Sequence, residues 1–261
     1  MRDIFHRTFT SFNAMGFFHS SKLFVSVLTI STFLTPFSAA AQKKFSKTYP
    51  ASKNIRLQLT NRSGTVTVTA WERNEIRIIA RMEAPAAKVL PEMSGDGLII
   101  NVVRDNYGKN EIGNVNFEVK VPAQSMVDIE TRVGNLTVKD VHGAMVRARI
   151  TSEGDITLSG IESEAVMAEN VIGDIFFDGS LQSGGNYRFA STKGNINLQL
   201  PFSSSFRLVA TAPSTSISLG AFSNSGLNFV SDGRRVVGSV GGGDSLLSVI
   251  NQRGSISFIR K

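Results

Sequence analysis

One short pattern returns along this chain and limits what it can fold into. A polar residue and a glycine are followed by a small polar residue and then by an apolar, a polar and an apolar residue, as in Glu153–Leu158. From Gly134 to Gly194 the glycine returns at steps of 20, 19 and 21 residues. The glycines of the series are Gly64, Gly134, Gly154, Gly173, Gly194 and Gly254, and a related segment around Thr215 lacks the glycine. A regular period of this length is typical of repeat architectures.

The residues after each glycine alternate between apolar and polar, which is typical of a β-strand with one buried face. Each period also holds a second alternating segment, such as Val146–Ala148. Two short strands per period, without helical periodicity after residue 42, predict an all-β parallel β-solenoid with coils of about 20 residues. A β-sandwich made of the same strands is the alternative fold. We expect these apolar pairs to point inward: Leu136/Val138, Ile156/Leu158, Ile175/Phe177, Ile196/Leu198 and Ile217/Leu219.

The glycine has a physical role in such a coil, because each coil must turn sharply before its next strand. A backbone with positive φ is least costly for glycine, and the Asn, Asp, Thr or Ser that follows can hydrogen-bond to the turn. Burying one aliphatic side chain contributes roughly 1.5–3 kcal/mol, but a single coil leaves its apolar pair exposed. The coils are therefore expected to fold by stacking on one another.

The pattern divides the chain into three regions. Residues 1–41 are expected to be a signal peptide, residues 42–120 an N-terminal β cap, and residues 121–261 the solenoid repeats, continuous with the cap in one domain. The strands of the cap region are less regular and are separated by turn-prone segments. A cap of this kind shields the open edge of the first coil. We expect the final segment, residues 236–261, to seal the opposite end.

Several features of residues 1–41 indicate export. Lys22 precedes a short apolar run, which is followed by small residues up to Ala41. A positive flank, a short apolar stretch and small residues before a cleavage site are typical of secretory signal peptides. Cleavage after Ala41 would place the protein in the periplasm, on the cell surface or outside the cell. The stretch before Lys22 is long, so Met15 is an alternative start to Met1, and an uncleaved helical anchor is the alternative for the apolar run.

The composition narrows the possible chemistry, because the chain has no cysteine and three histidines. Without cysteine there is no disulfide framework, no thiolate zinc site and no cysteine nucleophile. His6 and His19 lie in the expected signal peptide, which leaves His142 alone in a turn, where an exposed polar residue is ordinary. The segment Gly238–Ser245 lacks the Gly-Lys-Ser/Thr ending of a phosphate-binding loop. We therefore expect no cofactor and no metal.

The charge of the chain bears on its partners. The formal net charge is +7, and the three basic residues and one acidic residue of the expected signal peptide leave +5 in the rest. An exported protein meets no cytoplasmic nucleic acid, so we expect no nucleic-acid partner, and contact with a membrane only through the signal segment during export. The charge favours anionic cell-surface material or only maintains solubility.

Two carboxylates stand out. Asp155 and Asp174 occupy the same position in successive repeats, so a parallel stack brings their backbones about 4.8 Å apart. That spacing is close to the roughly 5–5.5 Å between the carboxyl groups of retaining glycosidases, and a carboxylate pair also suits calcium. The same column holds Asn135, Asn195, Ser216 and Ser255, which predicts a column of turn-forming residues instead. Both interpretations are open at this point.

Several segments together resemble one known family. They are Phe45–Tyr49, Gly64–Val68, Trp71–Ile76, Gly238–Gly243 and Asn251–Phe258. Their order, with the repeats between them, is similar to that of the bacterial β-strand-repeat domains of unknown function described as "putative adhesins". The resemblance covers nearly all of residues 43–261 and implies a right-handed β-solenoid on an exported protein. It implies no catalytic residues.

We expect an exported, non-enzymatic adhesin or cell-envelope interaction module that acts through its outer surface. Its partner would be an envelope glycan or another surface protein. The candidate binding residues are Asp155, Asp174, Phe176 and Arg188, where Phe176 would form an exposed patch with Arg188 or Tyr187, or else be ordinary surface variation. Two alternatives are a polysaccharide-active enzyme that uses Asp155 and Asp174, and a scaffold that self-assembles by stacking its ends.

Overall fold

The structure, a computed structural model, describes residues 42–213 and 215–261. The expected signal peptide, residues 1–41, lies outside the described residues and stays a prediction. In the described part of the chain, no helix is long and apolar enough to span a membrane. Two β-sheets contain most of these residues.

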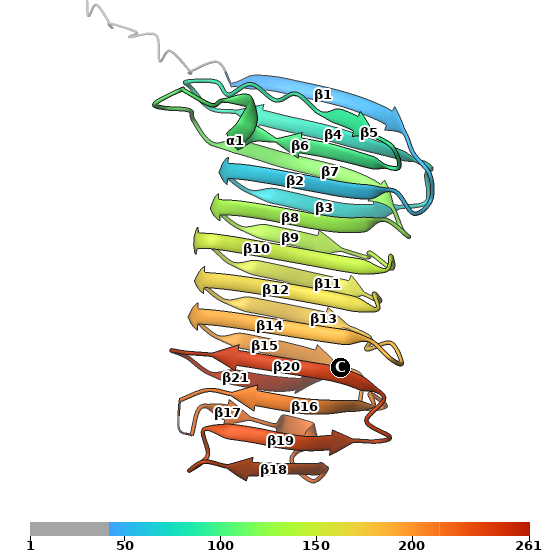
Figure 1. Cartoon of the computed structure of the whole chain (residues 1–261), viewed down its shortest axis with the longest axis vertical. Coiled ribbons are helices and arrows are strands. Elements are labelled where there is room, and N and C mark those ends of the chain that lie inside the picture. The colour runs from blue at the N-terminus through green and yellow to red at the C-terminus, as the bar shows by residue number, and fades with distance from the viewer. Residues whose placement is uncertain (1–41, 214) are drawn as a thin grey trace, which may run out of the picture. The chain divides into compact units, whose positions relative to one another are not determined.

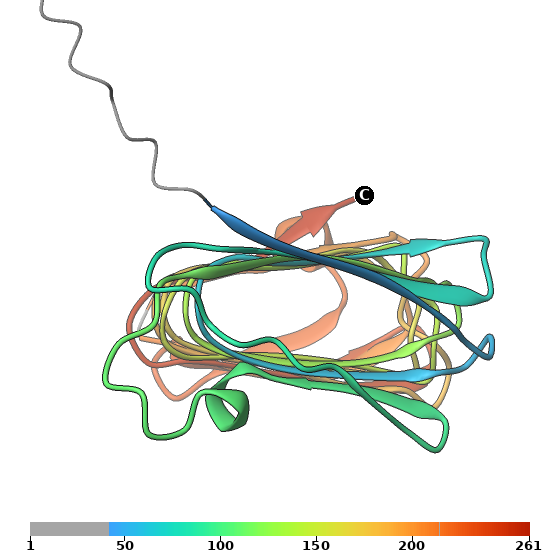
Figure 2. The same cartoon turned by 90° about the horizontal axis from the view of Figure 1, so that it is seen from above.

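The strands of the two sheets follow one another along a single stack (Figure 1). In spatial order, the ten-stranded sheet contains β1 (Lys43–Pro50), β4 (Glu75–Met82), β7 (Val115–Pro122), β3 (Val66–Trp71), β9 (Leu136–Lys139), β11 (Ile156–Ile161), β13 (Ile175–Gly179), β15 (Ile196–Leu200), β21 (Ile256–Arg260) and β17 (Ile217–Ser218). The eleven-stranded sheet contains β18 (Gly226–Val230), β19 (Arg235–Val240), β16 (Phe206–Thr211), β20 (Ser245–Asn251), β14 (Asn186–Lys193), β12 (Ala165–Ile172), β10 (Met145–Glu153), β8 (Met126–Val133), β2 (Arg56–Ser63), β6 (Gly97–Asn101) and β5 (Glu92–Ser94). Seen along the stack, the coils lie over one another as a flattened ring with one sheet on each long side (Figure 2).

The central part of the stack, from β8 to β15, is a regular series of coils. The chain alternates between the sheets, so that β8, β10, β12 and β14 are neighbours in one sheet and β9, β11, β13 and β15 are neighbours in the other. All of these neighbours are parallel, and the residues that follow the glycines, such as Leu136, Ile156 and Ile175, lie in register. The predicted parallel β-solenoid is confirmed, and the β-sandwich alternative is not the fold.

The core lies between the two sheets. All ten residues predicted to point inward are buried. Aromatic side chains join the two layers in the middle of the stack, where the ring of Phe177 on β13 lies 5.0 Å from that of Phe189 on β14. The period-two alternation of the sequence thus separates core from surface as predicted.

The recurring glycines form one column at a corner of the stack. Gly154 has a φ of 145° and Gly194 a φ of 136°, so both adopt the positive φ that the turn was expected to require. A Cβ atom added to Gly154 would lie 2.3 Å from the carbonyl oxygen of Gly134, and one added to Gly194 would lie 2.0 Å from that of Gly173. Glycine is therefore required at this corner for two reasons: the backbone has positive φ, and the neighbouring coil lies too close for a Cβ atom.

The last strands of the chain return into the stack. β20 lies between β14 and β16, and β21 lies between β15 and β17, in each case as a parallel neighbour. The end is formed by β18, β19 and the short helix η1 (Gly220–Phe222). The expectation that residues 236–261 seal this end is therefore wrong for β20 and β21. The physical reason is the glycine column, because Gly254 stacks directly on Gly194, whereas the segment at Thr215 has no glycine to continue it.

The N-terminal region contributes both a coil and a cap. β2 and β3 form a full coil that pairs in parallel with β8 and β9. Beyond it, β6 and β7 extend the two sheets in parallel, and β1, β4 and β5 add antiparallel strands. The helix α1 (Val102–Asp105) follows β6. Residues 42–120 thus supply the first coil of the stack in addition to its cap.

Candidate functional site

The outer face of the eleven-stranded sheet carries a continuous row of ion pairs. Its members, in order of contact, are Arg56, Asp128, Arg147, Glu130, Arg149, Glu169 and Arg188. The two pairs with Asp128 have nitrogen–oxygen distances of 3.3 Å, and the other pairs measure 3.4 to 3.6 Å. We call this set the ion-pair row; it crosses β2, β8, β10, β12 and β14.

The parallel register of the strands creates this row. Arg147 lies opposite Asp128, and Arg149 lies between Glu130 on one side and Glu169 on the other. Opposite charges that face each other across strands contribute roughly 0.2–1 kcal/mol per pair, and the partial exposure of these arginines places them toward the lower end. The row therefore contributes little to stability, and it alternates positive and negative charge across five strands of the surface.

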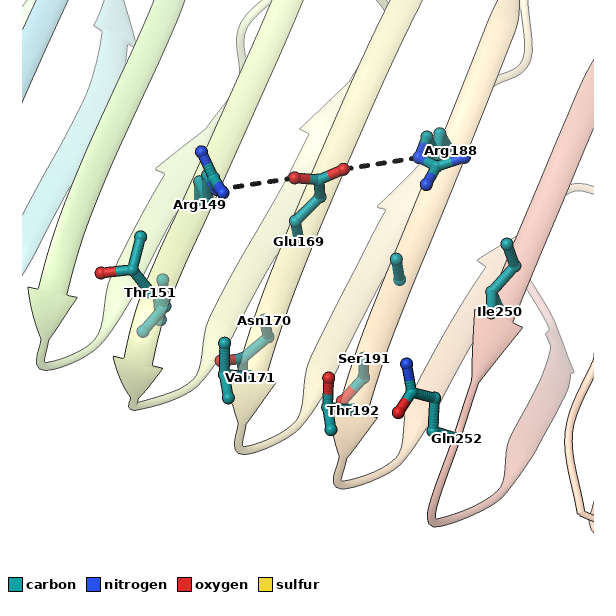
Figure 3. Close-up of a pocket in the computed structure, with 12 residues that line it drawn as sticks. Arg149, Thr151, Glu169, Asn170, Val171, Arg188, Ser191, Thr192, Ile250 and Gln252 are labelled. Atoms are coloured by element: carbon teal, nitrogen blue, oxygen red, sulfur yellow. Dashed lines mark hydrogen bonds and ion pairs between the residues drawn. The ribbon is translucent and has the colours of Figure 1, made fainter.

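A groove of about 400 Å³ lies beside one end of the ion-pair row, across β10, β12, β14 and β20. Figure 3 shows Arg149, Glu169 and Arg188 along one side of it. The other residues that line it are Ile150, Thr151, Asn170, Val171, Ala190, Ser191, Thr192, Ile250 and Gln252. Its volume falls within the roughly 300–1,000 Å³ of small-molecule sites, and its lining combines apolar side chains with hydroxyl and amide groups.

Arg188 is the last arginine of the ion-pair row at the end where the groove lies. Its Nε contacts Glu169 at 3.4 Å, and this is its only ionic partner among the described residues. Arg149, in contrast, uses its Nε for Glu169 and its Nη1 for Glu130. Arg188 also lines a second, smaller groove of about 140 Å³, together with Arg147 and Met167. Its Nη atoms are therefore free to donate hydrogen bonds to a ligand in either groove.

The structure separates the residues that the sequence grouped into one patch. Phe176 lies on β13 in the ten-stranded sheet, whereas Arg188 lies on β14 in the eleven-stranded sheet. Tyr187 is fully buried, so a surface patch with Phe176 is wrong for both partners. The reason is that successive residues of a strand point to opposite faces, and successive strands of the coil belong to opposite sheets.

The Tyr187 hydroxyl is held inside the stack. It donates to the carbonyl oxygen of Ser163 at 2.8 Å and accepts from the backbone N–H of Gln182 at 2.6 Å. Burial raises the pKa of Tyr187 above its usual value of 10.0; the Gln182 hydrogen bond opposes this shift, and the charge of Glu164 adds to it. Tyr187 is thus a structural residue that stays protonated.

Asp155 and Asp174 belong to a column of side chains at the glycine corner. The Oδ1 atom of Asp155 accepts from the backbone N–H of Asp174 at 2.8 Å, and the Oδ1 atom of Asp174 accepts from that of Asn195 at 2.7 Å. Asn135 accepts from the N–H of Asp155 in the same way, at 2.9 Å, and Asn195 from that of Ser255, at 3.1 Å. We call this set the corner column. Each side chain ties its coil to the next, as expected for a column of turn-forming residues.

Comparison with known families now places the fold. The profile described as "Toastrack DUF4097" matches residues 56–258, which is more than half of the chain. The chain belongs to the DUF4097 toastrack family. No curated protein is similar enough to this toastrack chain to count as a match.

Solved structures share the toastrack architecture at low sequence identity. A "putative cell adhesion protein" from Clostridium sporogenes is 12% identical, with a TM-score of 0.51, over 85% of this chain and 100% of its own. A "putative adhesin" from Bacteroides fragilis is 9% identical, with a TM-score of 0.33, over 85% of this chain and 99% of its own. A "putative lipid binding protein" from Parabacteroides distasonis is 10% identical, with a TM-score of 0.36, over 83% and 96%. The similarity to the Clostridium protein agrees with the all-β solenoid fold.

Sequence reasoning missed a second polar column inside the toastrack stack. Asn61, Asn170 and Asn251 lie near the ends of β2, β12 and β20, and all three are buried. The Nδ2 atom of Asn170 donates to the carbonyl oxygen of Gly154 at 2.6 Å, and that of Asn251 donates to the carbonyl oxygen of Gly194 at 2.8 Å. Asn170 and Asn251 therefore satisfy carbonyl groups of the glycine column, while Asn61 donates to the carbonyl oxygens of Ser63 and Val115. The available signal was an asparagine at a position where alternation predicts an apolar residue.

The remaining candidate, His142, is half-buried and lines an open groove together with Trp71 and Arg73. Within residues 42–213 and 215–261, no group of three or more His, Cys, Asp or Glu side chains is placed to hold a metal ion.

Proposed function

We propose that this toastrack protein is an exported, non-enzymatic interaction module of the adhesin type, which binds an envelope glycan or another surface protein along the outer face of its eleven-stranded sheet. The observation that carries the proposal is Arg188, whose free Nη atoms lie at the end of the ion-pair row and at the border of two grooves.

The groove suits an extended polar ligand. It crosses strands of four coils, so a ligand that lies in it contacts side chains far apart in the sequence. Thr151, Thr192 and Gln252 offer hydrogen bonds, while Val171 and Ile250 offer apolar surface. Arg149 and Glu169 already contact each other at 3.6 Å, which reduces the side-chain freedom that binding would remove.

Two further observations support an adhesin-type role. The features of residues 1–41 favour export. The similar Clostridium protein is described as a "putative cell adhesion protein". Binding to material of the cell envelope is consistent with both.

The test is a binding screen against envelope polysaccharides and surface proteins, followed by Arg188→Gln. The substitution keeps a polar side chain but shortens it and removes its charge-assisted donors. We expect the affinity for the best ligand to fall about tenfold or more, which corresponds to a loss of about 1.4 kcal/mol. The matched control is Arg77→Gln, an exposed arginine on β4 in the opposite sheet. Equal affinity in the two variants would contradict the proposed site.

A second candidate function, self-assembly by end stacking, rests on strand β18. β18 is the terminal strand of the eleven-stranded sheet and contains no charged residue. Phe229 on this strand is 52% exposed, and Val230 is exposed as well. Uncharged, apolar edge strands are sites where further strands can pair.

Light scattering over a concentration series tests this second candidate. If the ends stack, the mass rises with concentration, and Phe229→Lys abolishes the rise because a charge at the edge opposes pairing. A constant monomer mass dismisses the scaffold and leaves the interaction module unaffected.

A further inference from the structure

Three cationic side chains meet at the N-terminal end of the glycine corner without a carboxylate among them. Arg62 on β2 and Arg132 on β8 lie on neighbouring parallel strands, and the residues on either side of them are in register. Lys109, in the loop after α1, lines the same groove. In the described part of the chain none of the three forms a salt bridge, whereas the arginines of the ion-pair row are each paired with at least one carboxylate.

This arrangement places like charges close together, and none of the described residues puts an anionic side chain between them. Like charges on directly adjacent strands destabilise a sheet, and elsewhere on the same face the sequence places an aspartate or a glutamate between arginines. Arg62 is half-buried, so solvent screens its charge less completely than it would at the open surface. The corner therefore attracts negative charge.

The three cations surround a groove of about 330 Å³ that also has apolar walls. Tyr107 is 94% exposed and Val103 is 50% exposed at its rim. Arg104, which lies nearby in sequence, points to other partners, because its Nη2 contacts Glu92 at 3.1 Å and Asp105 at 3.3 Å. The groove thus offers an exposed aromatic ring next to cations that have no other ionic partner.

The wall that carries the tyrosine is held in place by hydrogen bonds, most of them made by the buried side chain of Asn106. The Nδ2 atom of Asn106 donates to the carbonyl oxygens of Lys88 and Val102, both at 2.8 Å, and its Oδ1 atom accepts from the N–H of Lys88 at 2.7 Å. At the start of α1, the side chain of Asn101 accepts from the N–H of Arg104 at 2.8 Å. The site is therefore preformed, which lowers the entropic cost of binding.

We infer that this corner is a binding site for a phosphate-bearing glycan. The guanidinium groups of Arg62 and Arg132 can bind phosphate oxygens through paired, charge-assisted hydrogen bonds, and Lys109 adds a third positive charge. The exposed ring of Tyr107 offers a flat apolar face against which the C–H face of a sugar ring can pack. A phosphate alone would leave this ring uncovered, and a nonionic sugar would leave the cations unpaired.

This inference deepens the proposed binding role but rests on different residues. The groove beside Arg188 has no lining residue in common with the groove formed by Arg62, Arg132 and Lys109. The two sites can therefore fail independently, and each has its own variants.

Isothermal titration calorimetry with glucose 1-phosphate, inorganic phosphate and glucose tests the site. We expect glucose 1-phosphate to bind most tightly, and its affinity to fall with added salt because the contact is ionic. In the double variant Arg62→Gln/Arg132→Gln, the Kd rises about tenfold or more. In Tyr107→Ala the Kd for glucose 1-phosphate rises a few-fold, while that for inorganic phosphate is unchanged.

The control is the double variant Arg77→Gln/Arg207→Gln, which removes the same charge from exposed arginines outside the groove. An equal loss of affinity in both double variants would overturn the inference, because the binding would then follow net charge alone. Equal affinity for inorganic phosphate and glucose 1-phosphate, or for glucose and glucose 1-phosphate, would also overturn it. A fourth arm uses phosphatidylcholine vesicles with and without phosphatidylglycerol; binding to the anionic vesicles without binding to glucose 1-phosphate would assign the site to a membrane surface instead.

Discussion

The central coils and the two ends of the stack follow different rules. From β8 to β15, strands that are neighbours within a sheet are two steps apart in the sequence, and all pairs are parallel. At the ends, antiparallel strands appear, and β20 and β21 enter between strands that precede them in the chain. The difference shows that the spacing of the repeated glycines predicts which strands are neighbours only where each coil packs on the coil that follows it in sequence.

The largest expected effect is a charge inside a central coil. Ile156→Asp places an unpaired carboxylate among the buried residues of β11, and because burying an unpaired charge costs several kcal/mol or more, we expect the domain not to fold. Thr157→Asp, on the outward face of the same strand, changes the free energy of unfolding by less than about 1 kcal/mol. Circular dichroism and urea unfolding measure both.

An end residue sharpens this comparison. Ile217→Asp makes the same change on β17, the last strand of its sheet, where the side chain is less completely enclosed. We expect the central coils to stay folded in this variant, because each repeat contacts only its neighbours. Equal behaviour of all three variants would contradict the assignment of inward and outward faces.

The corner glycines give the next largest effect. In Gly154→Ala the new Cβ meets the carbonyl oxygen of Gly134, and φ is positive. We expect a loss of about 2–3 kcal/mol in the free energy of unfolding, from backbone strain and steric overlap. Gly95→Ala, in the turn between β5 and β6 of the N-terminal cap, also has positive φ but meets no atom within 4 Å, so it is expected to cost only about 1 kcal/mol. Urea unfolding curves compare the two, and an equal loss would argue against a tight glycine column.

Tyr187 predicts a pH dependence. Its folded-state pKa lies above 10.0, so above pH 10 the unfolded chain loses the proton more readily than the folded chain, and stability falls as the pH rises. Below that pH the group contributes no pH dependence. Tyr187→Phe removes this component and costs about 1–3 kcal/mol at neutral pH, because Ser163 and Gln182 lose a buried partner. Urea unfolding of the parent and of the variant at pH 8 and pH 10.5 measures both effects. If stability fell equally in both proteins between these pH values, Tyr187 would not be the source of the pH dependence.

The smallest expected effect comes from the corner column, where two substitutions of Asp174 distinguish the role of its hydrogen-bond acceptor from that of its charge. Asp174→Ala removes the acceptor of the Asn195 N–H and is expected to cost about 1 kcal/mol. Asp174→Asn keeps an Oδ1 acceptor and is expected to be close to neutral.

The double variant Asp155→Asn/Asp174→Asn also tests the enzymatic alternative. We expect the parent protein to release no sugar from envelope polysaccharides. Release by the parent that is lost in the double variant would overturn the non-enzymatic proposal.

Much of the fold could be predicted from the sequence because the signals were local. Gly154, Asp155 and Ile156 are consecutive in the sequence. They indicate, in turn, a tight turn, a member of the polar column and a core position of the same coil. The insertion of β20 could not be predicted in this way, because it depends on which coil the chain packs against after the segment at Thr215. The repeated pattern at Gly254 indicates that the last part of the chain forms a coil, but the spacing of the glycines does not say where in the stack this coil lies.

Of the candidate site, the sequence found one residue and missed its surroundings. The sequence points to Arg188, but its partner Glu169, and Arg149 that shares this partner, come from other coils and are brought there by register. Phe176 was grouped with it because they are close in sequence, although a solenoid sends successive strands to opposite sheets. Contacts between coils need the exact register, which alternation alone does not give.

Engineered disulfides test the parallel stack most directly, because the chain contains no cysteine of its own. Thr157 on β11 is in register with Phe176 on β13, which is in register with Asn197 on β15. Adjacent strands lie about 4.8 Å apart, within the roughly 4.4–6.8 Å between the Cα atoms of a disulfide. The account predicts that Thr157→Cys/Phe176→Cys forms a disulfide on oxidation, measured by mass spectrometry, while Thr157→Cys/Asn197→Cys, two coils apart, keeps free thiols. A bridge in the second variant and none in the first would contradict the stack.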